Sequence, residues 1–189
     1  ACPSILTLKG RNFVLDLVAK YPANASLPIA VEGVTLSLST PAFITSIAPY
    51  KGQSPTLSTL LKKTYKMALP ATGTTDQADD NRLLWFGHNQ YLLISQSPPE
   101  PGIAKLAAMT DQSDAWTVLL LEGPLAAAAL AHHCPLDLRP SHFDLGQTAR
   151  APVAHLPSVV TPVNSGFEVM FMQSLVRTGI HHLQKAMRS

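Results

Sequence analysis

The chain has 189 residues, of which 46% are apolar and only 14% are charged, and its formal net charge is +2. An average globular protein carries about 25% charged residues. The composition therefore excludes disorder over most of the chain, and it leaves more apolar surface than an isolated monomer needs. The weak net charge excludes a polybasic surface for nucleic acid. We expect a globular protein with a protein partner and no nucleic-acid partner.

Cysteine content and hydropathy indicate the compartment. Cys2 and Cys134 do not form a disulfide framework, which favours a reducing cytoplasm. No basic segment followed by an apolar core opens the sequence, so we expect no secretory signal. The longest apolar run, Leu125–Ala131, is far shorter than the roughly 20 residues that span a bilayer. These features predict a soluble cytoplasmic protein without membrane contact.

In the first third of the chain, apolar spacing predicts a short helix over residues 11–20 and strands over residues 34–38 and 43–48. Ser54 is expected to cap a helix with Pro55 in its first turn. The apolar stripe of this helix consists of Leu57, Leu60, Leu61, Tyr65 and Leu69.

The middle third begins with a polar stretch, residues 71–82, that predicts a surface loop. Residues 83–95 form two apolar runs around Gly87-His88-Asn89, which indicates a β-hairpin. A proline-rich segment follows and separates this hairpin from a short helix expected over residues 103–109.

The stretch Thr117–Leu138 predicts the element around which the chain is organised. Val118–Leu121 has the continuous apolar pattern of a strand buried on both faces. Gly123-Pro124 ends that strand, and the alanine-rich helix Leu125–Ala131 follows until Pro135 prevents its continuation. The stretch is a scaffold and carries no reaction centre.

The last third predicts strands over residues 148–155, 159–163 and 168–172. A final helix is expected after Ser174 as its cap, with a buried stripe of Leu175, Val176, Ile180, Leu183 and Met187. Hairpins mixed with helices in this order indicate an α+β fold.

Catalytic and cofactor motifs are missing from the sequence. It has no nucleophile elbow, no dinucleotide-binding glycine loop and no phosphate-binding loop. The adjacent histidines His132-His133 and His181-His182 lack the spacing with which a helix chelates a metal. Asp111 and Asp114 could supply a general base, but a turn explains both residues better. We therefore assign no catalytic, cofactor or metal residue.

One stretch nevertheless resembles a known family. Residues 111–123, DQSDAWTVLLLEG, with Pro124 and the corner Cys134–Leu138, resemble the gamma subunit of heterotetrameric bacterial sarcosine oxidase. Residues 46–53, SIAPYKGQ, and the hairpin LLWFGHNQYLLIS extend the resemblance upstream. Tyr91 stands where this family more often has a tryptophan.

The resemblance implies a fold similar to the folate-binding aminomethyltransferase domain of the glycine cleavage system, with mixed and antiparallel sheets, β-hairpins and packed helices. It implies one domain over residues 1–189, or two interlocked α+β halves that meet near residues 96–102. The resemblance also implies a parent complex that oxidatively demethylates sarcosine. It implies that FAD, FMN, NAD, tetrahydrofolate and zinc are bound by the other subunits, and that the alpha subunit is the main partner, beside beta and delta.

Two functions follow from this resemblance. The favoured one is a non-catalytic accessory subunit that packs against the alpha subunit, and its candidate contact residues are Trp85, Tyr91, Pro135, Leu136, Asp137 and Leu138. The alternative is a stand-alone folate-binding one-carbon transferase in which Asp111 or Asp114 orients the pterin or the amine.

Overall fold

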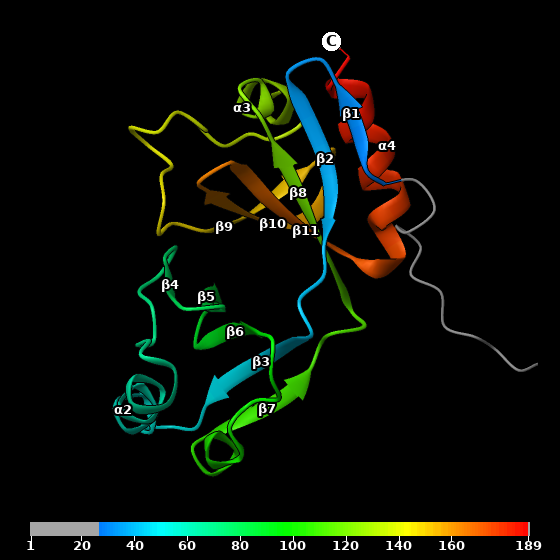
Figure 1. Ribbon diagram of the computed structural model, residues 1–189. Helices are drawn as coiled ribbons and strands as arrows, with labels where there is room; N and C mark the ends of the chain where they lie inside the picture. The colour runs from blue at the N-terminus through cyan, green and yellow to red at the C-terminus, as the bar shows by residue number, and fades with distance from the viewer. Residues whose placement is uncertain (1–26, 189) are drawn as a thin grey trace, which may run out of the picture.

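The computed structural model describes residues 27–188, and the helix expected over residues 11–20 and Cys2 lie outside this range. In chain order the elements are β1 (Ile29–Val31), β2 (Val34–Ser39), β3 (Phe43–Pro49), α2 (Ser54–Tyr65), β4 (Thr75–Ala78), β5 (Asn81–Gly87), β6 (Gln90–Ser95), the 3₁₀ helix η1 (Pro101–Lys105), β7 (Ala107–Asp111), β8 (Trp116–Glu122), α3 (Ala126–Ala131), β9 (Ala149–Val153), β10 (Leu156–Val163), β11 (Gly166–Met172), the 3₁₀ helix η2 (Gln173–Leu175) and α4 (Val176–Ala186) (Figure 1).

The strands form two antiparallel sheets. The six-stranded sheet has the order β1-β2-β8-β11-β10-β9, and the five-stranded sheet has the order β4-β5-β6-β3-β7. The α+β class with antiparallel sheets is thus confirmed. No helix among residues 27–188 is long and apolar enough to cross a membrane.

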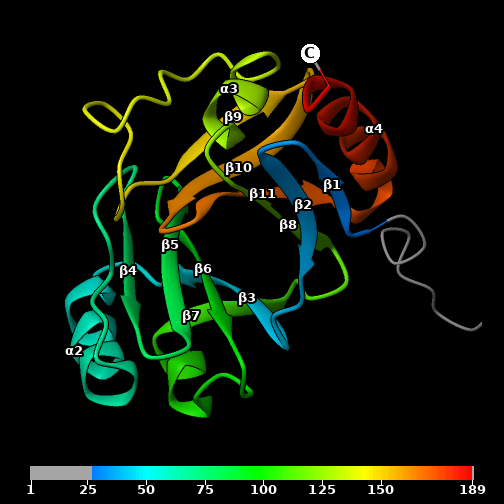
Figure 2. The same ribbon diagram turned by 45° about the horizontal axis from the view of Figure 1, so that its top comes forward.

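Three apolar clusters arrange the molecule in four layers. Residues of α3 and α4 pack on one face of the six-stranded sheet, and residues of α2 pack on the outer face of the five-stranded sheet. The inner faces of the two sheets meet through a smaller cluster that includes Ile44, Leu92, Val118 and Met170. Figure 2 shows the two sheets facing each other, with α2 on one side of the pair and α3 and α4 on the other.

The chain changes sheets at two neighbouring points, residues 40–42 and residues 112–115. The backbone N–H of Ile44 donates to Ser113 Oγ at 3.0 Å, and the N–H of Gln112 donates to the Ile44 carbonyl at 2.8 Å. The proline-rich segment of residues 96–102 instead connects β6 to η1 and β7, within the five-stranded sheet. A division into two halves near residues 96–102 stays a prediction.

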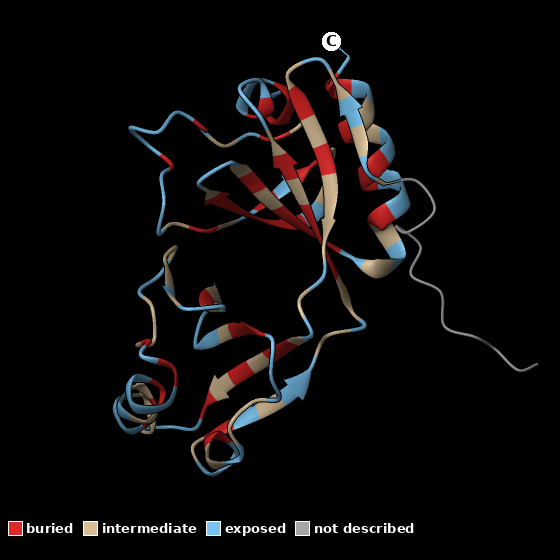
Figure 3. Ribbon diagram, viewed as in Figure 1, coloured by how far each residue is buried: buried red, intermediate tan, exposed pale blue. Residues whose placement is uncertain are grey.

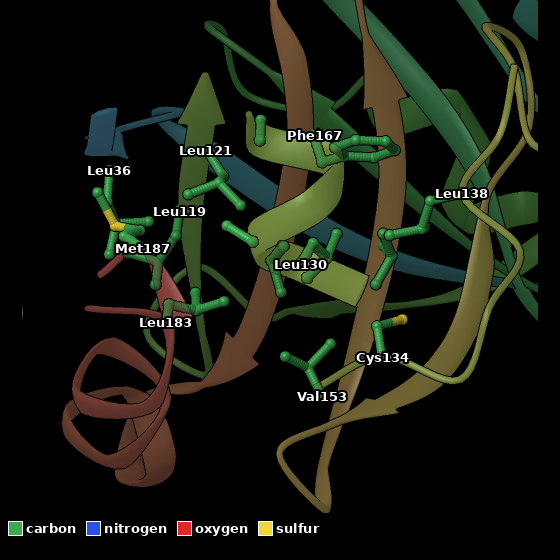
Figure 4. Packing of buried hydrophobic residues seen from close by; sticks show 14 of the residues in the cluster. Leu36, Leu119, Leu121, Leu130, Cys134, Leu138, Val153, Phe167, Leu183 and Met187 are labelled. Carbon is green, nitrogen blue, oxygen red and sulfur yellow. The ribbon is translucent and has the colours of Figure 1, made fainter. Parts of the chain in front are cut away.

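β8 is the buried central strand that its apolar run predicts. It pairs with β2 on one edge and β11 on the other. Leu119 and Leu121 belong to the core under α3 and α4, whereas Val118 points to the cluster between the sheets. Figure 4 shows these leucines grouped with Leu130 of α3 and Leu183 of α4. The strand therefore has apolar neighbours on both faces.

Gly123 sets the close approach of α3 to this sheet. It has a φ of +114°, and a Cβ atom built on it would collide with the carbonyl oxygen of Gly33. That oxygen accepts a hydrogen bond from the N–H of Leu125 at 3.2 Å. Only glycine fits this turn without strain, because it combines a positive φ with no side chain.

Most predicted strands and both long helices are present. The stripes of α2 and α4 face the sheets, with Leu57, Leu61 and Tyr65 buried in α2 and Val176, Ile180 and Leu183 buried in α4. Figure 3 shows the buried side of α4 turned toward the six-stranded sheet. Leu69 lies beyond the end of α2, where Lys66 adopts a left-handed conformation with a φ of 60°.

Four details of the prediction are wrong. Residues 71–82 are not all loop, because β4 pairs with β5 as a polar edge strand. Residues 103–109 are divided between η1 and β7, since β7 pairs with the edge of β3. Ser54 and Ser174 do not cap helices: Ser54 is the first residue of α2 and Ser174 lies within η2.

Candidate partner-contact surface

Trp85 and Tyr91 face each other as a cross-strand pair of the β5–β6 hairpin. Both side chains are partly buried. Tyr91 packs against the core between this sheet and α2. Trp85 lines an open groove at the junction of the two sheets. The hairpin therefore brings one of the two candidate aromatics to an accessible concave surface.

The corner Pro135–Leu138 differs from its prediction at one residue. Leu138 is only 6% exposed and belongs to the core under α3, so it is not available to a partner. Leu136 packs partly on the same core, and Pro135 and Asp137 are exposed. Leu138 is therefore an apolar anchor: its buried side chain holds the exposed residues Pro135 and Asp137 against the core of their own chain.

Asp137 forms a local ionic cluster with Arg139. Arg139 Nε donates to Asp137 Oδ1 at 2.8 Å, and His142 Nδ1 lies 3.6 Å from Asp137 Oδ2. The hydrogen bonds from Arg139 hold the pKa of the Asp137 carboxyl well below its usual range. The cluster lies at the surface, with the Arg139 side chain 72% and the Asp137 side chain 39% exposed, so it orders the corner without forming a buried site.

The groove that contains Trp85 has a volume of about 510 Å³ and is also lined by Trp116, Arg150, Pro152, His155 and Pro157, together with Ala151 and Ser158. Trp116 meets Phe86 edge-to-face, with ring centroids 5.6 Å apart. The Arg150 guanidinium carbon lies 4.6 Å from the centroid of the Phe86 ring. We call this concavity the aromatic groove. Phe86 and Arg150 connect the two sheets at this point.

A polar crevice lies elsewhere along the junction of the sheets. Arg82 of β5 donates a hydrogen bond to Glu168 of β11, and their side chains are 11% and 14% exposed. Two hollows of about 520 and 440 Å³ adjoin this pair, and both are lined by Gln77 and Asp79. Among the described residues, Arg82 Nε is buried without a hydrogen-bond partner. The pair joins the two sheets at a crevice lined by polar residues.

Asp111 takes the structural role that its residue type favours. Its Oδ1 accepts hydrogen bonds from the Ser113 N–H at 2.9 Å and the Ser113 hydroxyl at 2.6 Å. These bonds lower the pKa of the Asp111 carboxyl, which is therefore ionised and occupied in a turn. Asp114 is exposed in the same turn. Neither carboxylate faces the aromatic groove or the polar crevice.

Three histidines gather between α3 and α4. The rings of His133 and His182 are 5.4 Å apart, and the rings of His182 and His181 are 5.6 Å apart. Burial is the main cause that lowers the pKa of His133, and the electrostatic effect of His182 lowers it further. Within residues 27–188, no group of three or more His, Cys, Asp or Glu side chains could hold a metal ion. Burial also raises the pKa of the nearby Cys134 thiol.

Comparison with known proteins supports the family resemblance. No family model matches the chain. Sarcosine oxidase subunit gamma of Corynebacterium sp. (strain U-96) is 28% identical over 118 residues, which are 56% of this chain and 55% of that protein. The resemblance to the sarcosine oxidase gamma subunit is confirmed. The match spans about half the length of this curated relative.

A solved structure shows that the similarity extends to the fold. Heterotetrameric sarcosine oxidase from Corynebacterium sp. U-96, in complex with pyrrole 2-carboxylate, contains a chain that matches with a TM-score of 0.72 and 24% sequence identity. The match covers 85% of this chain and 87% of that chain. The two-sheet architecture is thus that of a known subunit of this oxidase.

The sequence predicted Trp85 as a surface residue but not the groove in which it lies. Arg150 is 65 positions further along the chain, and its contact with Phe86 depends on how the two sheets pack. The pair of Arg82 and Glu168 depends on the same packing. One local signal could have indicated the groove residues of β9: exposed and buried residues alternate along this strand. Arg150 and Pro152 therefore share the face opposite to the buried Ala151 and Val153.

Proposed function

We propose that this chain is a non-catalytic accessory subunit of a heterotetrameric sarcosine oxidase, which carries out the oxidative demethylation of sarcosine. The observation that carries the proposal is the similarity to sarcosine oxidase subunit gamma. The layered fold supports it, because two sheets packed face to face present a fixed surface to a partner. The low charge content also suits a lasting interface, which is more apolar than a transient one.

The proposal assigns the redox groups to the partner subunits. FAD, FMN and NAD need phosphate-binding loops, and the sequence carries none of the glycine motifs that form them. Tetrahydrofolate and zinc are assigned to the partners with them. We further propose that the fold is related to the folate-binding aminomethyltransferase domain. We propose that the alpha subunit is the main contact and that the beta and delta subunits complete the complex. We also propose that the complex is cytoplasmic.

Copurification tests this function. The tagged chain is expressed together with alpha, beta and delta subunits of a heterotetrameric sarcosine oxidase, and the retained proteins are identified by mass spectrometry. We expect all three subunits, with flavin absorbance and sarcosine-dependent peroxide formation in the complex. The chain purified alone is expected to be colourless and inactive. A yellow, active preparation of the isolated chain, or failure to retain the alpha subunit, would refute the proposal.

The alternative, a stand-alone folate-dependent transferase, needs a carboxylate that faces a pocket. The hydrogen bonds of Asp111 to Ser113 favour a turn instead. Calorimetry of the isolated chain with tetrahydrofolate separates the two functions. We expect no heat of binding. Micromolar binding that is lost in Asp111→Asn would support the transferase.

A further inference from the structure

The aromatic groove gathers the side chains that protein interfaces use as anchors. The chain has two tryptophans, Trp85 and Trp116, and both line this groove. Tryptophan and arginine are enriched among the residues that dominate binding energy at protein interfaces. Trp116 is packed against the cluster between the sheets, so its ring is held in place before any partner arrives. A preorganised anchor loses little side-chain entropy on binding.

The charge of the groove selects the partner. Arg150 and His155 are its ionisable lining residues, and among the described residues that line it there is no Asp or Glu. The one hydrogen bond that the structure gives the exposed Arg150 side chain goes to the Phe86 carbonyl at 3.4 Å. A guanidinium has five N–H donors, so Arg150 can still bind a carboxylate in two-pronged fashion. The groove is complementary to an acidic group.

The shape of the groove indicates an extended segment. Three successive residues of β9, Arg150 to Pro152, form one wall, and β10 contributes Pro157 and Ser158 beside them. Pro152 and Pro157 lie opposite each other in the register of the two strands. Trp116 belongs to β8, which lies two strands before β10 in the order of this sheet, so the groove extends across the strands from β8 to the edge strand β9. Grooves lined by tryptophan and proline rings accommodate extended chains.

From these observations we propose that the aromatic groove binds an extended segment of the alpha subunit, with an apolar side chain between Trp85 and Trp116 and a carboxylate on Arg150. This proposal rests on the proposed function, since it takes the alpha subunit as the partner. The proposal goes beyond that function because it names the docking surface on this chain and the conformation and charge of the bound segment.

Fluorine NMR tests the proposal directly. The chain is labelled with fluorotryptophan, so that its spectrum contains only the resonances of Trp85 and Trp116, and it is titrated with the unlabelled alpha homologue. Trp85→Phe and Trp116→Phe assign the two resonances. We expect both to shift on complex formation. If a complex forms while neither resonance moves, the groove is not the docking surface, although the accessory function stands.

Charge reversal tests the acidic group. In Arg150→Glu we expect the dissociation constant to rise at least about tenfold, because an attractive charge becomes repulsive. Arg177→Glu is the matched control: Arg177 is exposed on α4, which packs on the other face of the six-stranded sheet, and affinity should change by less than about twofold. If Arg150→Glu binds the alpha homologue with unchanged affinity while the fluorotryptophan resonances still shift, the proposal that the bound segment carries an acidic group on Arg150 is overturned. Absence of any complex would overturn the accessory function as well.

Discussion

Arg82 of β5 and Glu168 of β11 form an ion pair that joins the two sheets beside a polar crevice. Each sheet contributes one charge, and both side chains are nearly buried. Removing one partner leaves the other charge nearly buried and uncompensated, which costs far more than the net value of the pair.

We therefore expect Glu168→Gln to lower the free energy of unfolding by about 3 kcal/mol. The double substitution Arg82→Met with Glu168→Leu should be close to neutral, since it removes both charges and the buried Nε of Arg82 that has no partner among the described residues. Urea unfolding of the wild type and these two variants measures these energies. A neutral Glu168→Gln would contradict a structural role for the pair.

The exposed pair of Lys66 and Asp79 provides a control for this experiment. Lys66 Nζ lies 3.0 Å from Asp79 Oδ2, but the Lys66 side chain is 73% exposed and the Asp79 side chain 69%. Asp79 has a φ of 52°, which asparagine tolerates as well as aspartate does. Asp79→Asn should therefore change the free energy of unfolding by less than about 1 kcal/mol.

Gly123 should not tolerate a side chain. We expect Gly123→Ala to destabilise the chain by more than about 2 kcal/mol, because the methyl group meets the Gly33 carbonyl and the φ of +114° is strained for alanine. Gly52→Ala shares the positive φ, at +79°, but its methyl group has no atom within 4 Å. It should cost only about 1 kcal/mol. Thermal unfolding measures the loss of stability in each variant. The difference between them is the cost of the collision at Gly123, because backbone strain is present in both.

Gly179 of α4 lies against the ring of Phe171. A Cβ atom at this position would be 2.9 Å from Phe171 Cε2, and Phe171 is fully buried. Overpacking costs about 1–3 kcal/mol, and the better helix propensity of alanine returns about 1 kcal/mol. We expect Gly179→Ala to be destabilising by about 1 kcal/mol. A mutant cycle with Phe171→Leu should show a favourable coupling; additive energies would mean that α4 shifts freely.

Tyr65 should make stability depend on alkaline pH. Its hydroxyl oxygen accepts a hydrogen bond from the Glu100 N–H at 2.8 Å, and burial raises the pKa of the phenol above its ordinary value of 10.0. A pKa that is higher in the folded state means a contribution to stability that is complete below pH 10 and is lost as the pH rises through the folded-state value. Urea unfolding between pH 9 and pH 11.5, roughly the range around the ordinary phenol pKa, should show a steeper loss in wild type than in Tyr65→Phe. Equal slopes would exclude Tyr65 as the cause.

Local sequence patterns predicted the elements whose apolar residues share one face. β8 and the stripes of α2 and α4 belong to this group, because their burial follows directly from spacing. β4 was missed because its sequence TDQA has no alternation of apolar and polar residues and contains Asp76, a type depleted in strands; its pairing with β5 is a tertiary effect. Of residues 103–109, which were expected to form a helix, residues 107–109 pair with β3 instead, and this pairing is also a tertiary effect.

The surface residues were predicted less well than the elements. Trp85 could be selected by its residue type, but Leu138 was misassigned, since a single leucine after a proline corner gives no sign of the direction in which it points. Arg150 and Trp116 meet around Phe86, although the three residues come from strands in both sheets. Contacts of this kind depend on the packing of distant segments, which no local pattern contains.

The two points at which the chain leaves and re-enters the six-stranded sheet are held together by the bonds between Ile44 and the segment Gln112–Ser113. On either side of them β2 and β8 are already paired, from Thr35 with Glu122 to Ser39 with Val118. The whole five-stranded sheet is thus carried as one continuous insert whose ends meet. Such an insert can be exchanged as a unit by two cuts, one in residues 40–42 and one in residues 112–115, because these two segments lie side by side.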